Sequence, residues 1–342
     1  MAADATAKAP RDFTYITPRR RRVSEYEAVN LYGQPSIDGG WDIDPGMLRT
    51  PEGRPAWRVE STRLRHPDWF DFRDPSQLWQ RTFTKLQAEQ ERSIERATED
   101  AVAEGTFEDF DPVWLQEMAR HYRVWSFVEW GLFRAVFSAS RECLTDALSA
   151  AFTFEAFDRL RHAQDVVHYL LAIETAMPSF SDAGAKEVWL TDPVYQPLRE
   201  LVERLMHVTD DWAEVAVVLN LVFDPIATET AVSRLIGRHA PLHGDGVTPA
   251  IVRTTERDRR RNRAWTEELV RMVTAAEVPS ASANREIVSG WIESWTPAVV
   301  AATELLGAVH ARFPQRSAEF SDLLKAVLSA QPDLHIDAEV GA

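Results

Sequence analysis

The sequence predicts an all-α protein: a bundle of long helices preceded by an extended N-terminal arm. From about residue 75 onward, apolar residues recur at helical spacing, and no segment shows the alternation of a half-buried strand. Before that point Pro and Gly are frequent, and LYGQPSIDGGWDIDPGMLRTPEGRPAW predicts one turn after another. Long helices joined by short loops pack most naturally as a bundle.

Residues 1–76 form the predicted arm. A disordered tail would be poor in aromatic residues, whereas this segment is rich in them, so we expect its rings to be buried against the body or a partner. The run PRRRRV adds four arginines that suit an acidic partner surface. The predicted partner-binding residues are Arg19, Arg20, Tyr26, Tyr32 and Trp41, with the aromatic ones as interface hot spots.

Residues 77–342 form the predicted helical domain, and its first helix is expected to open just before it, at Asp74-Pro75. There Asp can cap the N-terminus and Pro suits the first turn. Gly105 is expected to close this helix, and Asp111-Pro112 predicts a second start of the same kind. The remaining helices are expected over residues 144–177, 192–208, 211–237, 248–273 and 283–313, with a short last helix near 317–329.

Length and composition limit the classes to which this protein can belong. The chain has 342 residues, a length that suits one large domain or two ordinary ones, and a net charge of −15 that argues against general nucleic-acid binding. No apolar run approaches the roughly 20 residues needed to cross a bilayer, and the N-terminus lacks the apolar core of a secretory signal. The single cysteine, Cys143, excludes an internal disulfide. We therefore expect a cytoplasmic protein with no membrane contact.

Two segments 100 residues apart share an Asp-x-x-Arg frame: DRLRH at 158–162 and DRRRN at 258–262. Di-iron carboxylate bundles carry Asp-Glu-x-Arg-His, where Glu and His lie three residues apart on one helix face and bind the same ion. In both segments here Arg replaces the Glu, and lone-acid positions of the same pattern fall upstream. The degenerate ligand slots are Glu129, Arg159, His162, Asp224, Arg259 and Asn262.

The two arginines argue against iron in this chain. A guanidinium is permanently charged and repels a metal ion strongly in a low-dielectric core, so we expect no metal, no cofactor and no catalytic residue. Buried charges need partners, and we therefore expect Arg159 to pair with Glu129 and Arg259 to pair with Asp224. His162 is then expected to be a hydrogen-bonded interior residue.

This degenerate, duplicated bundle resembles the β subunit of the hydroxylase component of soluble di-iron monooxygenases, a family that includes toluene, alkene, isoprene, propane and methane monooxygenases. The resemblance spans nearly the whole chain and is carried by SEYEAVNLYGQP, HPDWFDFRDPSQLWQRTFTKLQAEQE, DWAEVAVVLNLVFDP and GWIESWTP. These segments look closest to the aromatic and alkene branch. The resemblance implies a ferritin-like bundle, similar to the small subunit of ribonucleotide reductase.

The resemblance also implies a multicomponent system for alkene epoxidation or aromatic and alkene hydroxylation. An oxygenase α subunit holds the di-iron site that activates O₂, and a coupling or effector protein tunes it. A reductase with FAD and a 2Fe-2S cluster passes electrons from NADH. The present chain would then support the α subunit and perform no chemistry alone.

Two other interpretations stay open at this point. A stand-alone ferritin-like metal oxidase needs an intact Glu-x-x-His, but Glu203 and His207 are four residues apart. A helical interaction scaffold unrelated to oxygenases explains the helices but not the two frames. The Gly-rich loop that carries His243 and Asp245 is expected to be an ordinary loop rather than a metal site.

Overall fold

The structure is a computed structural model that describes residues 22–32, 59–313 and 319–330. Within these ranges the chain forms helices and no strands, which confirms the predicted all-α class. The helices are α1 (Glu25–Asn30), η1 (Val59–Ser61), η2 (Trp69–Asp71), α2 (Gln80–Ala103), η3 (Thr106–Asp109), α3 (Pro112–Glu117), η4 (Met118–Tyr122), α4 (Arg123–Ser140), α5 (Asp146–Ala176), α6 (Ala185–Thr191), α7 (Gln196–His207), α8 (Trp212–Val218), η5 (Leu219–Ile236), α9 (Gly237–His239), η6 (Ala240–His243), α10 (Thr248–Thr274), α11 (Ala281–Glu304), α12 (Gly307–His310) and α13 (Phe320–Ser329).

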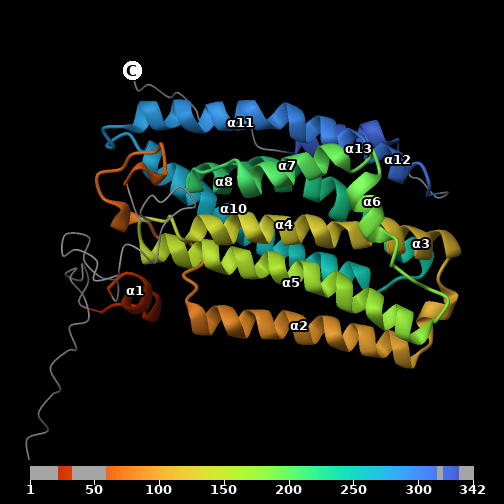
Figure 1. Cartoon of the computed structure of the whole chain (residues 1–342). Helices are drawn as coiled ribbons and strands as arrows, with labels where there is room; N and C mark the ends of the chain where they lie inside the picture. Colours follow the sequence, from red (N-terminus) through yellow and green to blue (C-terminus); the bar gives the residue numbers. More distant parts are fainter. Residues whose placement is uncertain (1–21, 33–58, 314–318, 331–342) are drawn as a thin grey trace, which may run out of the picture.

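The long helices run side by side in layers (Figure 1). α4 and α5 form a hairpin at the centre and pack against each other along much of their length. α2 covers the outer side of α5 and also contacts α10, whereas α7 and α11 lie on the opposite side of the hairpin. η5 contacts α8, α10, α11 and α13, so it lies in the interior of the bundle.

The first long helix begins later than predicted. α2 starts at Gln80 because the carboxylate of Asp74 accepts hydrogen bonds from Ser76 N at 2.8 Å and from the Ser76 hydroxyl at 2.6 Å, which closes a local turn. Gln77 then adopts a left-handed backbone with φ of 49°, through which a helix cannot continue. The other end agrees with the prediction, since Gly105 follows the helix with φ of 69°.

The second predicted start is confirmed, but its helix is interrupted. Asp111 caps α3 by accepting a hydrogen bond from Val113 N at 2.8 Å, with Pro112 in the first turn. The continuous helix expected after it is divided by η4, a short π-helical segment, into α3 and α4. α6 was not predicted at all.

The interior helix run Trp212–His243 is long and apolar enough to cross a membrane by composition, contrary to the expectation that no such run exists. Its most apolar window is 94% buried within the bundle, so it is the core helix of the fold. The segment η5 is a wide π-helix that contains Pro225, whose missing N–H and ring disturb regular α-helical hydrogen bonding. Asn220, Asp224 and Thr228 follow one another at four-residue spacing in this segment, and all three are buried.

The part of the predicted arm that the structure describes between residues 59 and 74 contacts the helical body. Arg63 N donates to Asp211 Oδ2 at 2.7 Å and Arg65 N donates to Asn284 Oδ1 at 3.0 Å, so the segment 59–74 lies on the helical body. The ring of Trp69 also meets that of Trp212, with centroids 5.5 Å apart.

Two of the predicted partner-binding aromatics are in fact core residues, which corrects that prediction. Tyr26 is 3% exposed and Tyr32 is 4% exposed, because α1 turns its apolar side onto the chain's own bundle. The Tyr26 hydroxyl accepts a hydrogen bond from Asp74 N at 2.9 Å. The other three predicted residues, Arg19, Arg20 and Trp41, lie outside the described residues.

Candidate functional site

The degenerate ligand slots of the first frame meet the lone-acid slot of the second frame at the centre of the bundle. Glu129 comes from α4, Arg159 and His162 from α5, and Asp224 from η5. All four are buried, and Arg159 is fully so. The frame spacing therefore identified side chains that the fold brings together.

Three acids surround the guanidinium of Arg159. Asp224 binds both terminal nitrogens, with Nη1 donating to Oδ1 at 3.0 Å and Nη2 pairing with Oδ2. Glu129 Oε2 lies 3.4 Å from Nη1 and Glu155 Oε1 lies 3.3 Å from Nη2. The predicted contact between Arg159 and Glu129 is present, but the bidentate contact between Arg159 and Asp224 is shorter.

The predicted pairing of Arg259 with Asp224 is wrong. Arg159 takes both oxygens of that carboxylate, and Arg259 Nη2 instead donates to Ser233 Oγ at 2.9 Å. Glu155 was missed, although it lies one helical turn before Arg159, a spacing that places two residues on one face.

Neighbouring polar groups donate further hydrogen bonds to two of the acids, Asp224 and Glu155. The Thr228 hydroxyl donates to Asp224 Oδ1 at 2.7 Å, and Asn220 Nδ2 donates to Glu155 Oε2 at 2.9 Å. Both donors belong to η5, so the wide helix supplies an acid and two of the groups that hold the acids in place.

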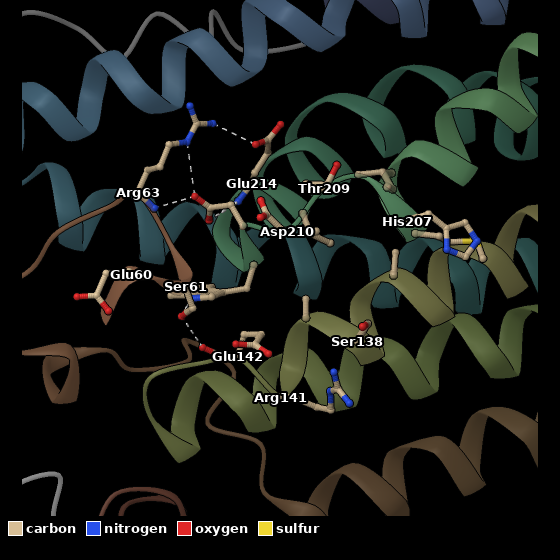
Figure 2. Close-up of a pocket in the computed structure, with 17 residues that line it drawn as sticks. Glu60, Ser61, Arg63, Ser138, Arg141, Glu142, His207, Thr209, Asp210 and Glu214 are labelled. Carbon is tan, nitrogen blue, oxygen red and sulfur yellow. Dashed lines mark hydrogen bonds and ion pairs between the residues drawn. The ribbon is translucent and has the colours of Figure 1, made fainter. Parts of the chain in front are cut away.

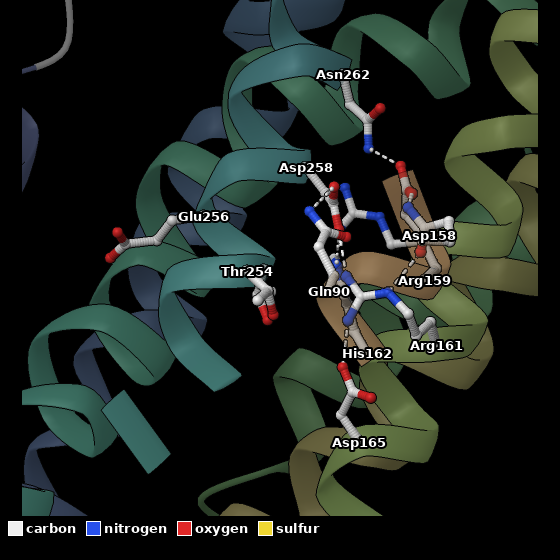
Figure 3. Close-up of polar contacts among 12 residues, drawn as sticks. Gln90, Asp158, Arg159, Arg161, His162, Asp165, Thr254, Glu256, Asp258 and Asn262 are labelled. Carbon is white, nitrogen blue, oxygen red and sulfur yellow. Dashed lines mark hydrogen bonds and ion pairs between the residues drawn. The ribbon is translucent and has the colours of Figure 1, made fainter. Parts of the chain in front are cut away.

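The two frames also exchange partners across the bundle (Figure 3). Asp158 of α5 pairs with Arg261 and accepts a hydrogen bond from Asn262 Nδ2 at 3.1 Å, both from α10. The aspartate of the first frame thus binds the fourth and fifth residues of the second.

The aspartate of the second frame binds the fourth and fifth residues of the first frame in the same way. Asp258 of α10 pairs with Arg161, and its Oδ2 lies 3.1 Å from His162 Nε2, both from α5 (Figure 3). α2 contributes one hydrogen-bond donor to each aspartate: Gln87 Nε2 donates to Asp158 Oδ1 at 2.9 Å, and Gln90 Nε2 donates to Asp258 Oδ1 at 3.2 Å. His162 is therefore a hydrogen-bonded interior residue, as expected.

Two of the acids around Arg159 have pKa values that are shifted in opposite directions. Burial alone would raise the pKa of Glu129, but the charge of Arg159 and the nearby imidazole of His162, whose Nδ1 lies 3.7 Å from Glu129 Oε2, outweigh it and lower this pKa to about 2. Burial raises the pKa of Glu155 to about 7, against the opposing effects of Arg159 and Asn220. Glu129 is thus ionised at neutral pH, whereas Glu155 titrates near it.

The residues in these slots do not fit the di-iron centre that the resemblance implies for related subunits. The Arg159 guanidinium lies among the three carboxylates, where a bound cation would need them. Within residues 22–32, 59–313 and 319–330, no group of three or more His, Cys, Asp or Glu side chains is arranged to hold a metal ion. No metal-dependent step follows from this site.

Two minor candidates are structural. Asp245 accepts hydrogen bonds from Trp114 Nε1 at 3.0 Å and from the Tyr169 hydroxyl at 2.8 Å, and it also binds the backbone of its own loop. The loop that carries it is therefore an anchored connection, as expected. Glu203 pairs with Arg199 at 2.7 Å on the outside of α7, away from the buried site.

A pocket of about 590 Å³ lies where the 59–63 segment meets α4, α7 and α8 (Figure 2). Acids and bases both line it. Arg63 Nη2 donates to Glu214 Oε2 at 3.1 Å, and Arg63 also pairs with Asp211. These contacts fasten the N-terminal segment to the bundle.

The chain is similar to known hydroxylase subunits. The sequence profile of the Methane/Phenol/Alkene Hydroxylase family matches residues 48–277. The propane 2-monooxygenase hydroxylase component small subunit of Rhodococcus jostii is 30% identical over 94% of this chain and 86% of that protein. The methane monooxygenase component A beta chain of Methylosinus trichosporium is 29% identical over 90% and 79% of the two chains.

The similarity extends to toluene and phenol systems. The hydroxylase subunit beta of the toluene-4-monooxygenase system of Ectopseudomonas mendocina is 27% identical over 87% of this chain and 89% of that protein. Two solved structures share the fold: toluene 4-monooxygenase with toluene bound (TM-score 0.71, 24% identity, 83% of this chain and 92% of that one) and phenol hydroxylase from Pseudomonas sp. OX1 (TM-score 0.66, 21%, 92% and 96%). Sequence identity does not favour the aromatic and alkene branch, because propane and methane relatives are 28–30% identical.

We predict that Arg159 is coupled more strongly to Asp224 than to Glu129. Arg159→Met should lower the free energy of unfolding by about 3–5 kcal/mol, because it leaves several buried acids without their cation. In double-mutant cycles measured by urea unfolding, the coupling with Asp224→Asn should exceed that with Glu129→Gln, since only Asp224 binds both nitrogens. Equal coupling energies would contradict the assigned geometry.

We also predict a pH-dependent effect of Glu155→Gln. The folded-state pKa of Glu155 is raised from 4.5 to about 7, so its contribution to stability is fully present below about pH 4.5 and is lost as pH rises through 7. The stability of Glu155→Gln relative to the unmodified chain should therefore rise by about 1–3 kcal/mol between pH 4.5 and 8. The exposed control Glu203→Gln should show no such trend, and a flat difference for Glu155→Gln would refute the assignment.

Proposed function

Because the chain belongs to the methane, phenol and alkene hydroxylase family, as a β subunit of a multicomponent di-iron monooxygenase hydroxylase, we propose that it is the non-catalytic support of an iron-carrying α subunit. One observation carries this proposal: the guanidinium of Arg159 holds three acids at the centre of the bundle. A fixed organic cation there keeps the acids and their helices together, and it offers no open position for oxygen or substrate.

The wider system is part of the same proposal. The chain works with an oxygenase α subunit that holds the di-iron site, a coupling or effector protein, and a reductase that carries FAD and a 2Fe-2S cluster and draws electrons from NADH. The proposal includes an alkene or aromatic substrate, supported by the likeness of segments such as GWIESWTP to that branch although overall identity does not favour it, and a cytoplasmic complex. Names such as "hydroxylase component small subunit" and "component A beta chain" among the relatives support a division of labour of this kind.

The two alternatives are weaker. A stand-alone metal oxidase needs ligands in the slots where Arg159 and Arg259 stand. A scaffold unrelated to oxygenases leaves unexplained a family match over residues 48–277 and the exchange of partners between two duplicated frames.

An aromatic face on α4 supports assembly with another subunit; it consists of Trp130, Phe133 and Phe137. Trp130 is 49% exposed and Phe137 is 45% exposed, and their ring centroids lie 5.2 and 5.7 Å from that of Phe133. Exposed clusters of large apolar rings mark interaction surfaces. Arg134 is exposed on the same helix, so a symmetric pairing of two copies through this face brings like charges together. We assign the face to the α subunit.

Metal analysis tests the central proposal. The full chain, purified from iron-supplemented cells without its α subunit, should hold no stoichiometric iron, because Arg159 competes with any cation for the same carboxylates. The complex with the α subunit should contain iron. Stoichiometric iron in the isolated chain that disappears in Glu129→Gln or His162→Asn would overturn the proposal.

Co-purification tests the two partner surfaces. Deletion of residues 1–21 removes three of the four arginines of the basic run and leaves the Ser24 cap of α1 in place. This deletion, and separately Trp130→Ser with Phe137→Ser, should leave the melting temperature of the chain unchanged and weaken its hold on the α subunit. An anchor worth about 2 kcal/mol corresponds to roughly thirtyfold in affinity.

The exposed residue Val208, which is 72% accessible and lies beyond α7, provides the matched control. Val208→Ser should co-purify with the α subunit in full yield. If a surface variant also retains the α subunit in full yield, with full monooxygenase activity, that surface is not the interface.

A further inference from the structure

The second frame contains a buried arginine that forms no ion pair with an acid among the described residues. Arg259 stands in the slot that corresponds to Arg159, and it is 7% exposed. Its Nη2 donates to Ser233 Oγ at 2.9 Å, whereas its Nη1 is buried with no hydrogen-bond partner in the described part of the chain. No ion pair joins Arg259 to any acid in the described part of the chain, although its counterpart Arg159 has three. A buried cation in this state is costly unless an anion neutralises it.

Arg259 lines a surface pocket of about 540 Å³ between η5, α10 and the end of α13. This volume is in the range of pockets that take small molecules. The charged residues of its lining are Arg234, Arg238, Arg259, Arg260, Arg263, Asp224, Glu229 and Glu256.

Each acid in this pocket already has a cation. The pairs are Asp224–Arg159, Glu229–Arg234 at 2.7 Å and Glu256–Arg260 at 3.8 Å. Arg263 pairs with Glu267, at 2.7 Å. Among the described residues, the ion pairs of this pocket's arginines involve Arg234, Arg260 and Arg263, and none involves Arg238 or Arg259. The pocket therefore has an excess of positive charge on a chain whose net charge is −15.

We propose that this pocket binds an oxyanion, a carboxylate or phosphate group, that neutralises Arg259 as Asp224 neutralises Arg159. The first frame shows what an arginine in this slot holds: a carboxylate bound through two nitrogens. Carboxylate and phosphate both match the fork of a guanidinium, and a second cation, Arg238, lines the same pocket.

The oxyanion has two candidate sources. One is a free anion from solution. The other is the chain itself, because Val327 and Ala330 line the pocket and the sequence that follows them carries Asp333, Asp337 and Glu339. The chemistry at Arg259 is the same in both cases, and the experiment separates them.

Calorimetric titration of the full chain with sodium phosphate, at ionic strength held constant with sodium chloride, tests the proposal. The unmodified chain should bind phosphate saturably, and Arg259→Gln should weaken this binding by at least about tenfold. Arg260→Gln is the matched control, because its side chain is 77% exposed and already paired with Glu256. It should change the affinity by less than about threefold.

A second readout does not depend on affinity alone. Phosphate should raise the melting temperature of the unmodified chain, since a ligand of the folded state stabilises it. In a chain shortened to residue 330, which lacks the carboxylates of residues 331–342, Arg259→Met should melt no lower than the same chain with Arg259 when no phosphate is present, because it removes an unpaired buried charge, and phosphate should not raise its melting temperature.

A chain that ends at residue 330 identifies the source. Tighter phosphate binding by this shorter chain shows that a carboxylate of residues 331–342 occupies the pocket in the full chain, and unchanged binding shows a free anion. Both outcomes support an oxyanion site at Arg259. Absence of saturable binding by both chains, or equal binding by Arg259→Gln, overturns it.

Discussion

The structure depends on one constraint: a full positive charge at the centre of a helical bundle must be neutralised there. Arg159 has no access to water, and the attraction and desolvation of charges are both large in such surroundings. Acids from α4, α5 and η5 therefore have to meet it at the same point. This requirement fixes the relative register of three helices, because sliding any one of them by a turn leaves a buried charge without a partner.

The exchange between the two frames extends this constraint to α10 and α2. Asp158 and Asp258 each bind the opposite frame, and α2 contributes one glutamine to each aspartate. Buried ion pairs are weak evidence of stability as such, since a well-packed apolar core does as well. Here the buried ion pairs act on specificity. The five helices pair all of these charges in one arrangement, and the Asp-x-x-Arg pattern in the sequence reflects that arrangement.

The parts of the fold that could be predicted depend on local chemistry. Asp111 caps its helix and Gly105 ends one, because the preferences of these residues act within a few positions. The meeting of Glu129 and Arg159 followed from the spacing of a known frame. The turn at Asp74 was missed because its carboxylate favours either a cap or a local turn, and sequence does not decide between them. The burial of Tyr26 was missed because an aromatic ring does not indicate which surface covers it. The partner of Asp224 depends on the path of the wide helix η5, which no local pattern encodes.

The arginine at the centre of the bundle also sets when the subunit can fold. A protein that builds its core around a metal ion is held together only once the ion has arrived, so its maturation follows the supply of that ion. A guanidinium is part of the chain from synthesis onward and carries its charge at every physiological pH. The helices of this subunit can therefore close around their own cation in an iron-starved cell, and under the proposed function they do so before any iron reaches the α subunit.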